Sequence, residues 1–193
     1  MKLTYKSREV GLSVPEQGFS RLIEETCGLA RAEIFLSAAI RQIVTVGGRI
    51  KWEDARRSLT GFQAALYDVS LITPPGLTVV ATGEAVEESS EEHATARRFV
   101  SGPAREFSLV VDDDYRVSSG TVEGTRVTVF TNPGADDERA SLIRDAAARA
   151  LAAFARRYGP YPYTELDIVE TELAGALGVS WAGIIFLDSS ELL

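Results

Sequence analysis

Apolar residues recur at helical spacing between about residues 138 and 157. The apolar side chains that keep to one face are Leu142, Ile143, Ala146, Ala150, Leu151 and Phe154. Asp136 or Asp137 can cap the start, because a carboxylate there accepts hydrogen bonds from first-turn N–H groups that lack a helical partner. Gly159 can take the left-handed conformation at the end, and Pro160 cannot continue the helix. The pattern predicts a long helix over about 138–157 that ends at Gly159.

A strand-like pattern occupies residues 66–130. Runs such as 67–72, 78–82 and 106–111 are rich in β-branched and apolar residues, and proline and glycine turns separate them. The segment 84–93 is rich in glutamate, which predicts an exposed hairpin loop that contains His93. We therefore expect a series of consecutive strands before the helix.

The first part of the chain has a mixed pattern. Phe19, Leu22, Ile23, Cys27 and Ala30 follow helical spacing, which predicts a helix over about 16–30. From there to Val46 the pattern fits either one helix or two strands. The β-branched residues 43–46, which precede Gly47-Gly48, favour a strand that enters a turn.

The composition shifts at a Ser/Gly-rich segment over 117–124, which predicts a domain boundary. The expected fold class is α+β: a mostly antiparallel β-domain followed by a β-α-β-β portion. Residues 1–48 are an uncertain mixture of helix and strand, residues 49–118 form the β-domain, and residues 119–193 form the second domain.

Charge and composition narrow the classes of partner. The 193-residue chain carries 20 Lys and Arg against 28 Asp and Glu, a net charge of −8. Such a chain repels phosphate backbones, and without a basic patch we expect no nucleic-acid partner.

No window approaches the roughly 20 apolar residues that span a bilayer, and no signal-peptide pattern begins the chain, so we expect no membrane partner. The single cysteine, Cys27, cannot form an internal disulfide, which favours the cytoplasm.

Four motifs follow one another along about two thirds of the chain, over residues 62–187. They are Ala65-Leu-Tyr-Asp-Val-Ser-Leu-Ile-Thr-Pro-Pro-Gly-Leu-Thr-Val-Val-Ala-Thr-Gly83, Arg98-Phe-Val-Ser-Gly-Pro-Ala-Arg-Glu-Phe-Ser-Leu-Val-Val111, Tyr158-Gly-Pro-Tyr-Pro-Tyr-Thr-Glu-Leu-Asp-Ile-Val169 and Gly178-Val-Ser-Trp-Ala-Gly183. Their order resembles the gluzincin zinc metallopeptidases of the membrane-alanyl-aminopeptidase family. A fainter match is Arg49-Ile-Lys-Trp-Glu-Asp-Ala-Arg-Arg57. The resemblance implies that the second domain is the start of a thermolysin-like catalytic domain.

The resemblance also implies a zinc cofactor and a peptide substrate in the full-length protein. The family binds zinc through an H-E-x-x-H helix, which would come after Leu193. His93 is the only histidine here, so we expect no metal ligands and no catalytic residues in this chain, which would be an inactive fragment by itself. The alternative is a catalytically inactive relative that acts as a protein-binding or scaffold module.

The family's substrate-binding strand matches Gly178, Val179, Ser180 and Trp181. Ser180 stands where aminopeptidases carry a glutamate that pairs with the substrate ammonium group, and Arg49 matches a second ammonium-binding position. Both departures weaken the exopeptidase interpretation. The alternative for this segment is an ordinary turn into a buried strand, with Trp181 in the core. Because the family's catalytic helix would cover this region, self-association through exposed apolar surface is also expected.

Overall fold

A computed structural model describes residues 66–173 and 176–189, together with four earlier strands over 12–13, 18–26, 29–36 and 42–47. The chain divides into two compact units, Met1–Asp113 and Asp114–Leu193. The predicted boundary between residues 118 and 119 falls inside β10 (Arg116–Val122). This strand pairs along its whole length with β11 (Thr125–Thr131), so it belongs with the second unit.

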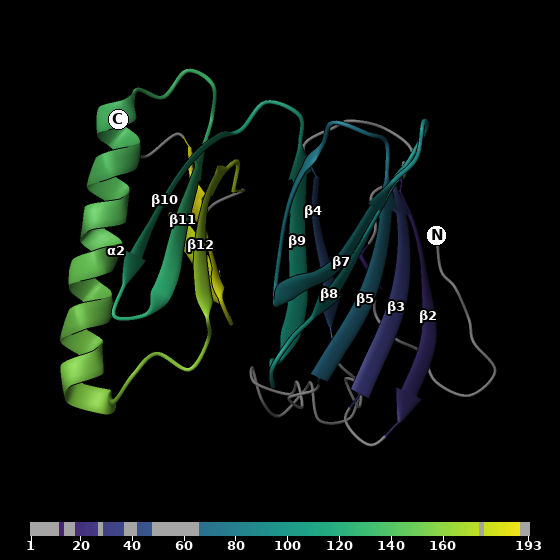
Figure 1. Cartoon of the computed structure of the whole chain (residues 1–193), viewed down its shortest axis with the longest axis horizontal. Coiled ribbons are helices and arrows are strands. Elements are labelled where there is room, and N and C mark those ends of the chain that lie inside the picture. The colour runs from purple at the N-terminus through teal and green to yellow at the C-terminus, as the bar shows by residue number, and fades with distance from the viewer. Residues whose placement is uncertain are drawn as a thin grey trace. The chain divides into compact units, whose positions relative to one another are not determined.

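The first unit contains two β-sheets, with strand orders β1-β4-β9-β6 and β2-β3-β5-β8-β7 (Figure 1). All described strand pairs in it are antiparallel except β3 with β5, which agrees with the predicted, mostly antiparallel β-domain. The strands are β1 (Leu12–Ser13), β2 (Gly18–Thr26), β3 (Leu29–Leu36), β4 (Gln42–Gly47), β5 (Leu66–Thr73), β6 (Thr78–Ala81), β7 (Glu84–Ser90), β8 (Thr95–Val100) and β9 (Glu106–Asp112).

The two sheets of this unit share an aromatic core. The rings of Tyr67 on β5 and Phe107 on β9 lie 5.9 Å apart, and Phe99 on β8 lies 6.3 Å from Phe107. The Tyr67 hydroxyl donates to the Arg105 carbonyl at 2.8 Å, which satisfies the one polar atom of that ring. Burial of each large apolar side chain contributes about 1.5–3 kcal/mol, so this contact between sheets is a main source of stability for the unit.

The predicted helix over 16–30 is wrong. β2 and β3 occupy this segment as an antiparallel hairpin, whose register shifts between Leu22 and Glu24. A β-bulge places one extra residue, Ile23, in the strand and so interrupts the period of two. The interruption put apolar residues at spacings that resemble a helix. The strand expected over 43–46 is confirmed as β4, whereas Cys27 lies outside the described residues.

A predicted loop and the segment predicted to hold the domain boundary are strands instead. Residues 84–90 form β7, which is exposed along its whole length and lies at the edge of its sheet, so the prediction of exposure was right and that of a loop was wrong. The Ser/Gly-rich segment 117–124 is largely β10 and its turn. Glu123 and Gly124 both have positive φ, at 49° and 84°, as the tightest turns between antiparallel strands require.

The second unit is a five-stranded mixed sheet with one helix. Its strand order is β10-β11-β12-β14-β13; β11, β12 and β14 run parallel, and the two outer strands are antiparallel to their neighbours (Figure 1). The elements introduced here are α2 (Asp137–Tyr158), β12 (Glu165–Thr171), β13 (Gly178–Trp181) and β14 (Ile184–Asp188). Together with the first unit, this confirms a β-rich fold with a helix in its second part.

The long helix is confirmed at both ends. Asp136 is the N-terminal cap, and its carboxylate accepts from the Arg139 N–H at 2.8 Å. Gly159 ends the helix with φ 95°, and its N–H donates to the Ala155 carbonyl. The helix packs on the sheet through Leu151, in a cluster with four buried strand residues: Val127, Val129, Leu166 and Ile168.

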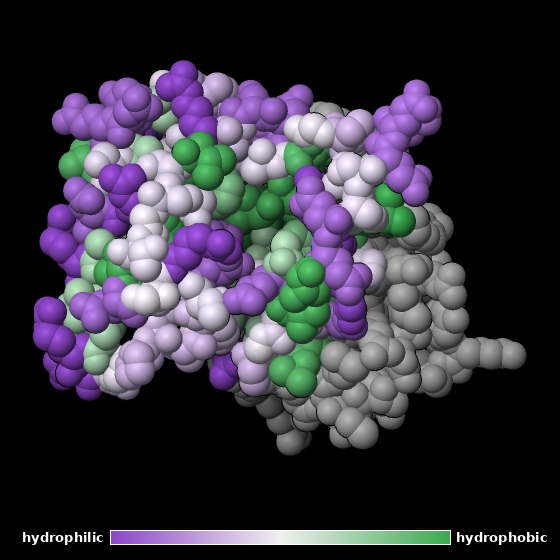
Figure 2. Space-filling model, viewed as in Figure 1, coloured by the Kyte–Doolittle hydropathy of each residue, from purple (hydrophilic) through white to green (hydrophobic). Residues whose placement is uncertain are grey.

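The predicted apolar face of α2 is only partly buried. Leu142 on its outer side is 62% exposed, and Phe154 near its C-terminus is 59% exposed. Most of the outward surface of α2, at the left of Figure 2, is hydrophilic. The exposure of the aromatic residue Phe154 is therefore an exception on this helix, and it needs a structural reason.

Candidate functional site

The predicted substrate-binding segment is a strand at the edge of a sheet. β13 pairs with β14, with Gly178 opposite Leu187 and Ser180 opposite Ile185. Among the described strands, none lies on its other side. An edge strand presents backbone N–H and C=O groups that another extended chain can pair with.

The hydrogen-bond pattern identifies which backbone groups face outward. The Asp188 N–H donates to the Leu177 carbonyl at 3.0 Å, so this opposing pair is a hydrogen-bonded one. Such pairs alternate along an antiparallel ladder, and Val179 and Trp181 therefore also bond to β14. The N–H and C=O groups of Gly178 and Ser180 consequently point toward the open edge.

The side chains of β13 divide between the two faces of the sheet. Trp181 makes an edge-to-face contact with buried Phe186, with ring centroids 5.1 Å apart, so its side chain has a packing role. Ser180 is exposed and shares the opposite face with Ile185. At Gly178, an added Cβ would lie 3.2 Å from the Phe186 carbonyl oxygen, closer than a relaxed contact, so a side chain there would require β14 to shift by a few tenths of an ångström.

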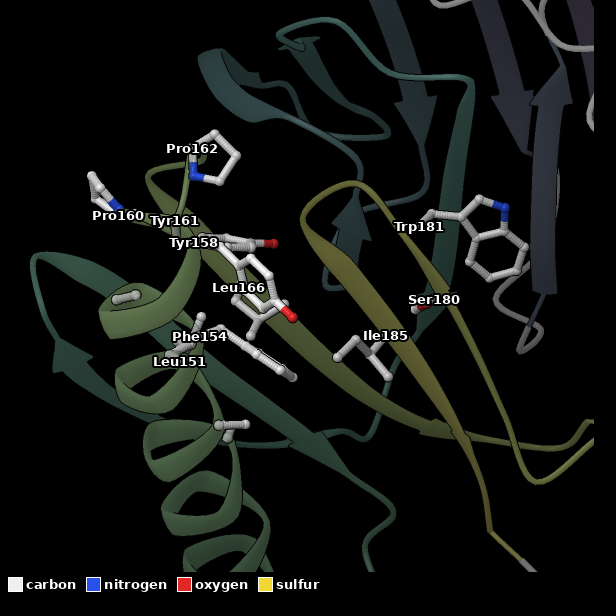
Figure 3. A pocket seen from close by; sticks show the side chains of 14 residues that line it. Leu151, Phe154, Tyr158, Pro160, Tyr161, Pro162, Leu166, Ser180, Trp181 and Ile185 are labelled. Atoms are coloured by element: carbon white, nitrogen blue, oxygen red, sulfur yellow. The ribbon is translucent and has the colours of Figure 1, made fainter.

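An apolar groove of about 620 Å³ runs beside β13 on the side of the sheet that faces α2. Its main lining residues are Leu151, Phe154, Tyr158, Tyr161, Leu166 and Ile185, with Ser180 at its rim (Figure 3). No lining residue is charged. The guanidinium of Arg157 lies 5.6 Å from the centre of the Tyr158 ring, so a cation adjoins the groove wall.

The groove exists because one helix covers only part of the sheet. α2 lies mainly over β10 and β11 (Figure 1). A helix is about 10 Å wide and strands are about 4.8 Å apart, so one helix covers roughly two strands. Within the part of the chain that the structure describes, the same face of β14 and β13 is therefore only partly covered beside the C-terminal half of α2. This explains why Phe154 and Tyr158 are 59% and 74% exposed.

The aromatic-proline motif forms one end of the groove. Tyr161 and Tyr163 contact each other edge to face at 5.4 Å, and Pro160 and Pro162 line the groove with Tyr161. Partial burial raises the pKa of the Tyr161 phenol, and a hydrogen bond from the Gly183 backbone opposes this effect. The motif thus ties the end of α2 to the β13–β14 turn.

Asp167, within the same motif region, is an ionisable group that the sequence reasoning did not single out. It lies on β12, is 9% exposed, and faces away from the groove because its neighbours Leu166 and Ile168 pack toward α2. Burial, and then the charge of Glu165, raise the pKa of Asp167 to about 7, although Arg126 and a hydrogen bond with Thr128 oppose the shift. The sequence signal that could have identified Asp167 is the presence of an acidic residue within a strand-like run.

Glu170 is a second buried acid on β12, 2% exposed. One carboxylate oxygen accepts from the Asn132 N–H at 2.9 Å, and the other lies 3.3 Å from the guanidinium of Arg139 on α2. These contacts join the C-terminal end of β12 to the first turns of the helix. The role of Glu170 is structural.

Among the described residues, Asp112, Asp113 and Asp114 are grouped closely enough to hold a cation, with carboxylate oxygens within 4.8 Å of one another. Oxygen ligands suit hard ions such as Mg²⁺ or Ca²⁺, whereas protein zinc sites favour nitrogen and sulfur. His93 is exposed in the turn between β7 and β8. The described residues thus do not fit a peptidase zinc ion, and Arg49 lies outside them.

Comparison of the sequence with protein-family models and with curated proteins finds no match. Within the part of the chain that the structure describes, no helix combines the length and apolar character needed to cross a membrane.

Proposed function

We propose that this chain is the substrate-binding part of a zinc-dependent metallopeptidase of the gluzincin type. The observation that carries the proposal is the open edge of β13, beside an uncharged groove. In the resemblance described above, the same four residues, Gly178–Trp181, hold an extended peptide through its backbone.

The edge supports binding of a peptide as an added strand. The outward N–H and C=O groups of Gly178 and Ser180 can form up to four main-chain hydrogen bonds with an extended partner. Each is worth about 0.5–1.5 kcal/mol net, which suits reversible binding of a short segment. The role of this chain is to hold and orient the peptide.

Zinc in this proposal is held by residues outside those described. A second helix placed over Leu166 and Ile185 would fill the groove and bring its own side chains next to β13.

The test compares this 193-residue chain with the product of the complete reading frame. We expect the complete protein to hold one zinc per chain and to hydrolyse peptides, with loss of activity on chelation, whereas the shorter chain does neither. Elemental analysis and a fluorogenic peptide assay measure both properties. Tight zinc binding with hydrolysis by the shorter chain would refute this division of roles.

A second candidate is a catalytically inactive relative that binds peptides or proteins. The observation that favours it is Ser180, which stands exposed where the resemblance implies a glutamate. A complete protein that binds peptides at β13, but holds no zinc and hydrolyses none, would favour this candidate.

A further inference from the structure

We infer that β13 prefers uncharged internal or blocked peptide segments and disfavours a free amino terminus. This inference rests on the proposed function, because it concerns which peptides the same edge accepts. Its basis is the charge distribution around the edge.

The surface that a peptide would meet along β13 is uncharged. From Leu177 to Trp181 the strand and its lead-in carry no charged side chain, and neither does any residue that lines the groove. A substrate ammonium group beside Ser180 would lie next to a neutral hydroxyl. It would lose part of its hydration without gaining a carboxylate partner.

The charged group that adjoins the groove wall has the wrong sign for an amine. The guanidinium of Arg157 lies against the ring of Tyr158, which lines the groove. This cation repels a terminal ammonium group and tolerates a neutral amide. The carboxylates of Asp167 and Glu165 do not offset the positive charge of Arg157. They alternate along β12 with Leu166, which lines the groove, and so they face the other side of the sheet.

The apolar side chains of β13 indicate which segments fit. Leu177 is 71% exposed and lies on the same face as Val179 and Trp181, whereas Gly178 and Ser180 leave the groove side of the strand small. Side chains on adjacent strands that lie opposite each other contact directly. An extended segment with apolar residues at alternate positions therefore matches this face.

The experiment uses the tetrapeptide amide Val-Thr-Val-Thr in two forms, one with an acetylated amino terminus and one with a free amino terminus. The peptide has four residues because β13 is four residues long. Binding to the 193-residue chain is followed by NMR of the Gly178 and Ser180 amides and by their hydrogen exchange. We expect the acetylated peptide to bind about threefold or more tightly than the free amine. Equal binding, or tighter binding of the free amine, would overturn the inference.

A substitution provides the complementary test. Ser180→Glu should shift the preference about tenfold toward the free amine, and Thr121→Glu, an equal charge on the opposite edge strand β10, should not. A Ser180→Glu chain without this shift would show that the terminus does not lie beside residue 180. If neither peptide perturbs the two amides, peptide binding at β13 itself fails, which is a different result from a wrong preference.

Discussion

Glu170 shows how one buried carboxylate can connect a strand to a helix. Its partner Arg139 retains some contact with water, with a side chain that is 24% exposed against 2% for Glu170. We expect Glu170→Gln to lower the free energy of unfolding by about 3 kcal/mol, because Arg139 would lose the negative charge of Glu170. Urea unfolding measures the loss.

The control for this prediction is Glu172→Gln, which removes an exposed carboxylate two residues away. It should change stability by less than about 0.5 kcal/mol. Equal effects of the two substitutions would mean that the contact with Arg139 contributes nothing measurable.

Asp167 should make stability depend on pH. Its pKa is raised in the folded chain, from 3.8 to about 7, because burial disfavours the charged form. The stability that the folded chain gains from keeping Asp167 protonated is therefore fully present below about pH 4. It is lost as the pH rises through about 7, where the buried carboxyl group becomes charged. We expect Asp167→Asn to be more stable than the wild type at pH 8, by on the order of 2–4 kcal/mol.

Thermal unfolding of both chains between pH 4 and pH 8 tests this prediction. The difference between them should grow across that interval, since asparagine does not titrate. Parallel stability curves would show that Asp167 is not the group responsible.

At the scale of elements, local signals predicted α2 because its determinants are adjacent in sequence. Asp136, the apolar stripe and Gly159 lie within one segment, and each has its effect over a few residues. The hairpin of β2 and β3 was missed because the bulge at Ile23 depends on pairing with a second strand. Periodicity in one strand cannot reveal where its partner imposes an extra residue.

The sequence suggested a position for the candidate site, but it could not predict the geometry there. The resemblance placed substrate binding at Gly178–Trp181. That β13 is an edge strand follows from β14 pairing between it and β12, a pairing order that no local pattern encodes. The groove likewise depends on how many strands one helix covers, so it became visible only in the folded unit.

For the molecule as a whole, exposed apolar surface and net charge have opposite effects on association. The groove exposes Phe154 and Tyr158, which favours contact with a second copy, whereas a charge of −8 makes copies repel one another. Salt screens this repulsion and leaves apolar burial largely unaffected. The balance should therefore shift toward association as ionic strength rises.

We accordingly propose that the 193-residue chain self-associates through the groove, and more strongly in high salt. Sedimentation velocity at about 0.05 and 0.5 M NaCl should show a larger associated fraction at the higher concentration. The double substitution Phe154→Ser and Tyr158→Ser should abolish most of it. Leu142→Ser removes a residue that is 62% exposed on the outer side of the same helix, and it should leave association unchanged. If instead Leu142→Ser disrupts association and the double substitution does not, the outer face of α2 is the contact, and the groove remains free for a peptide or a second helix.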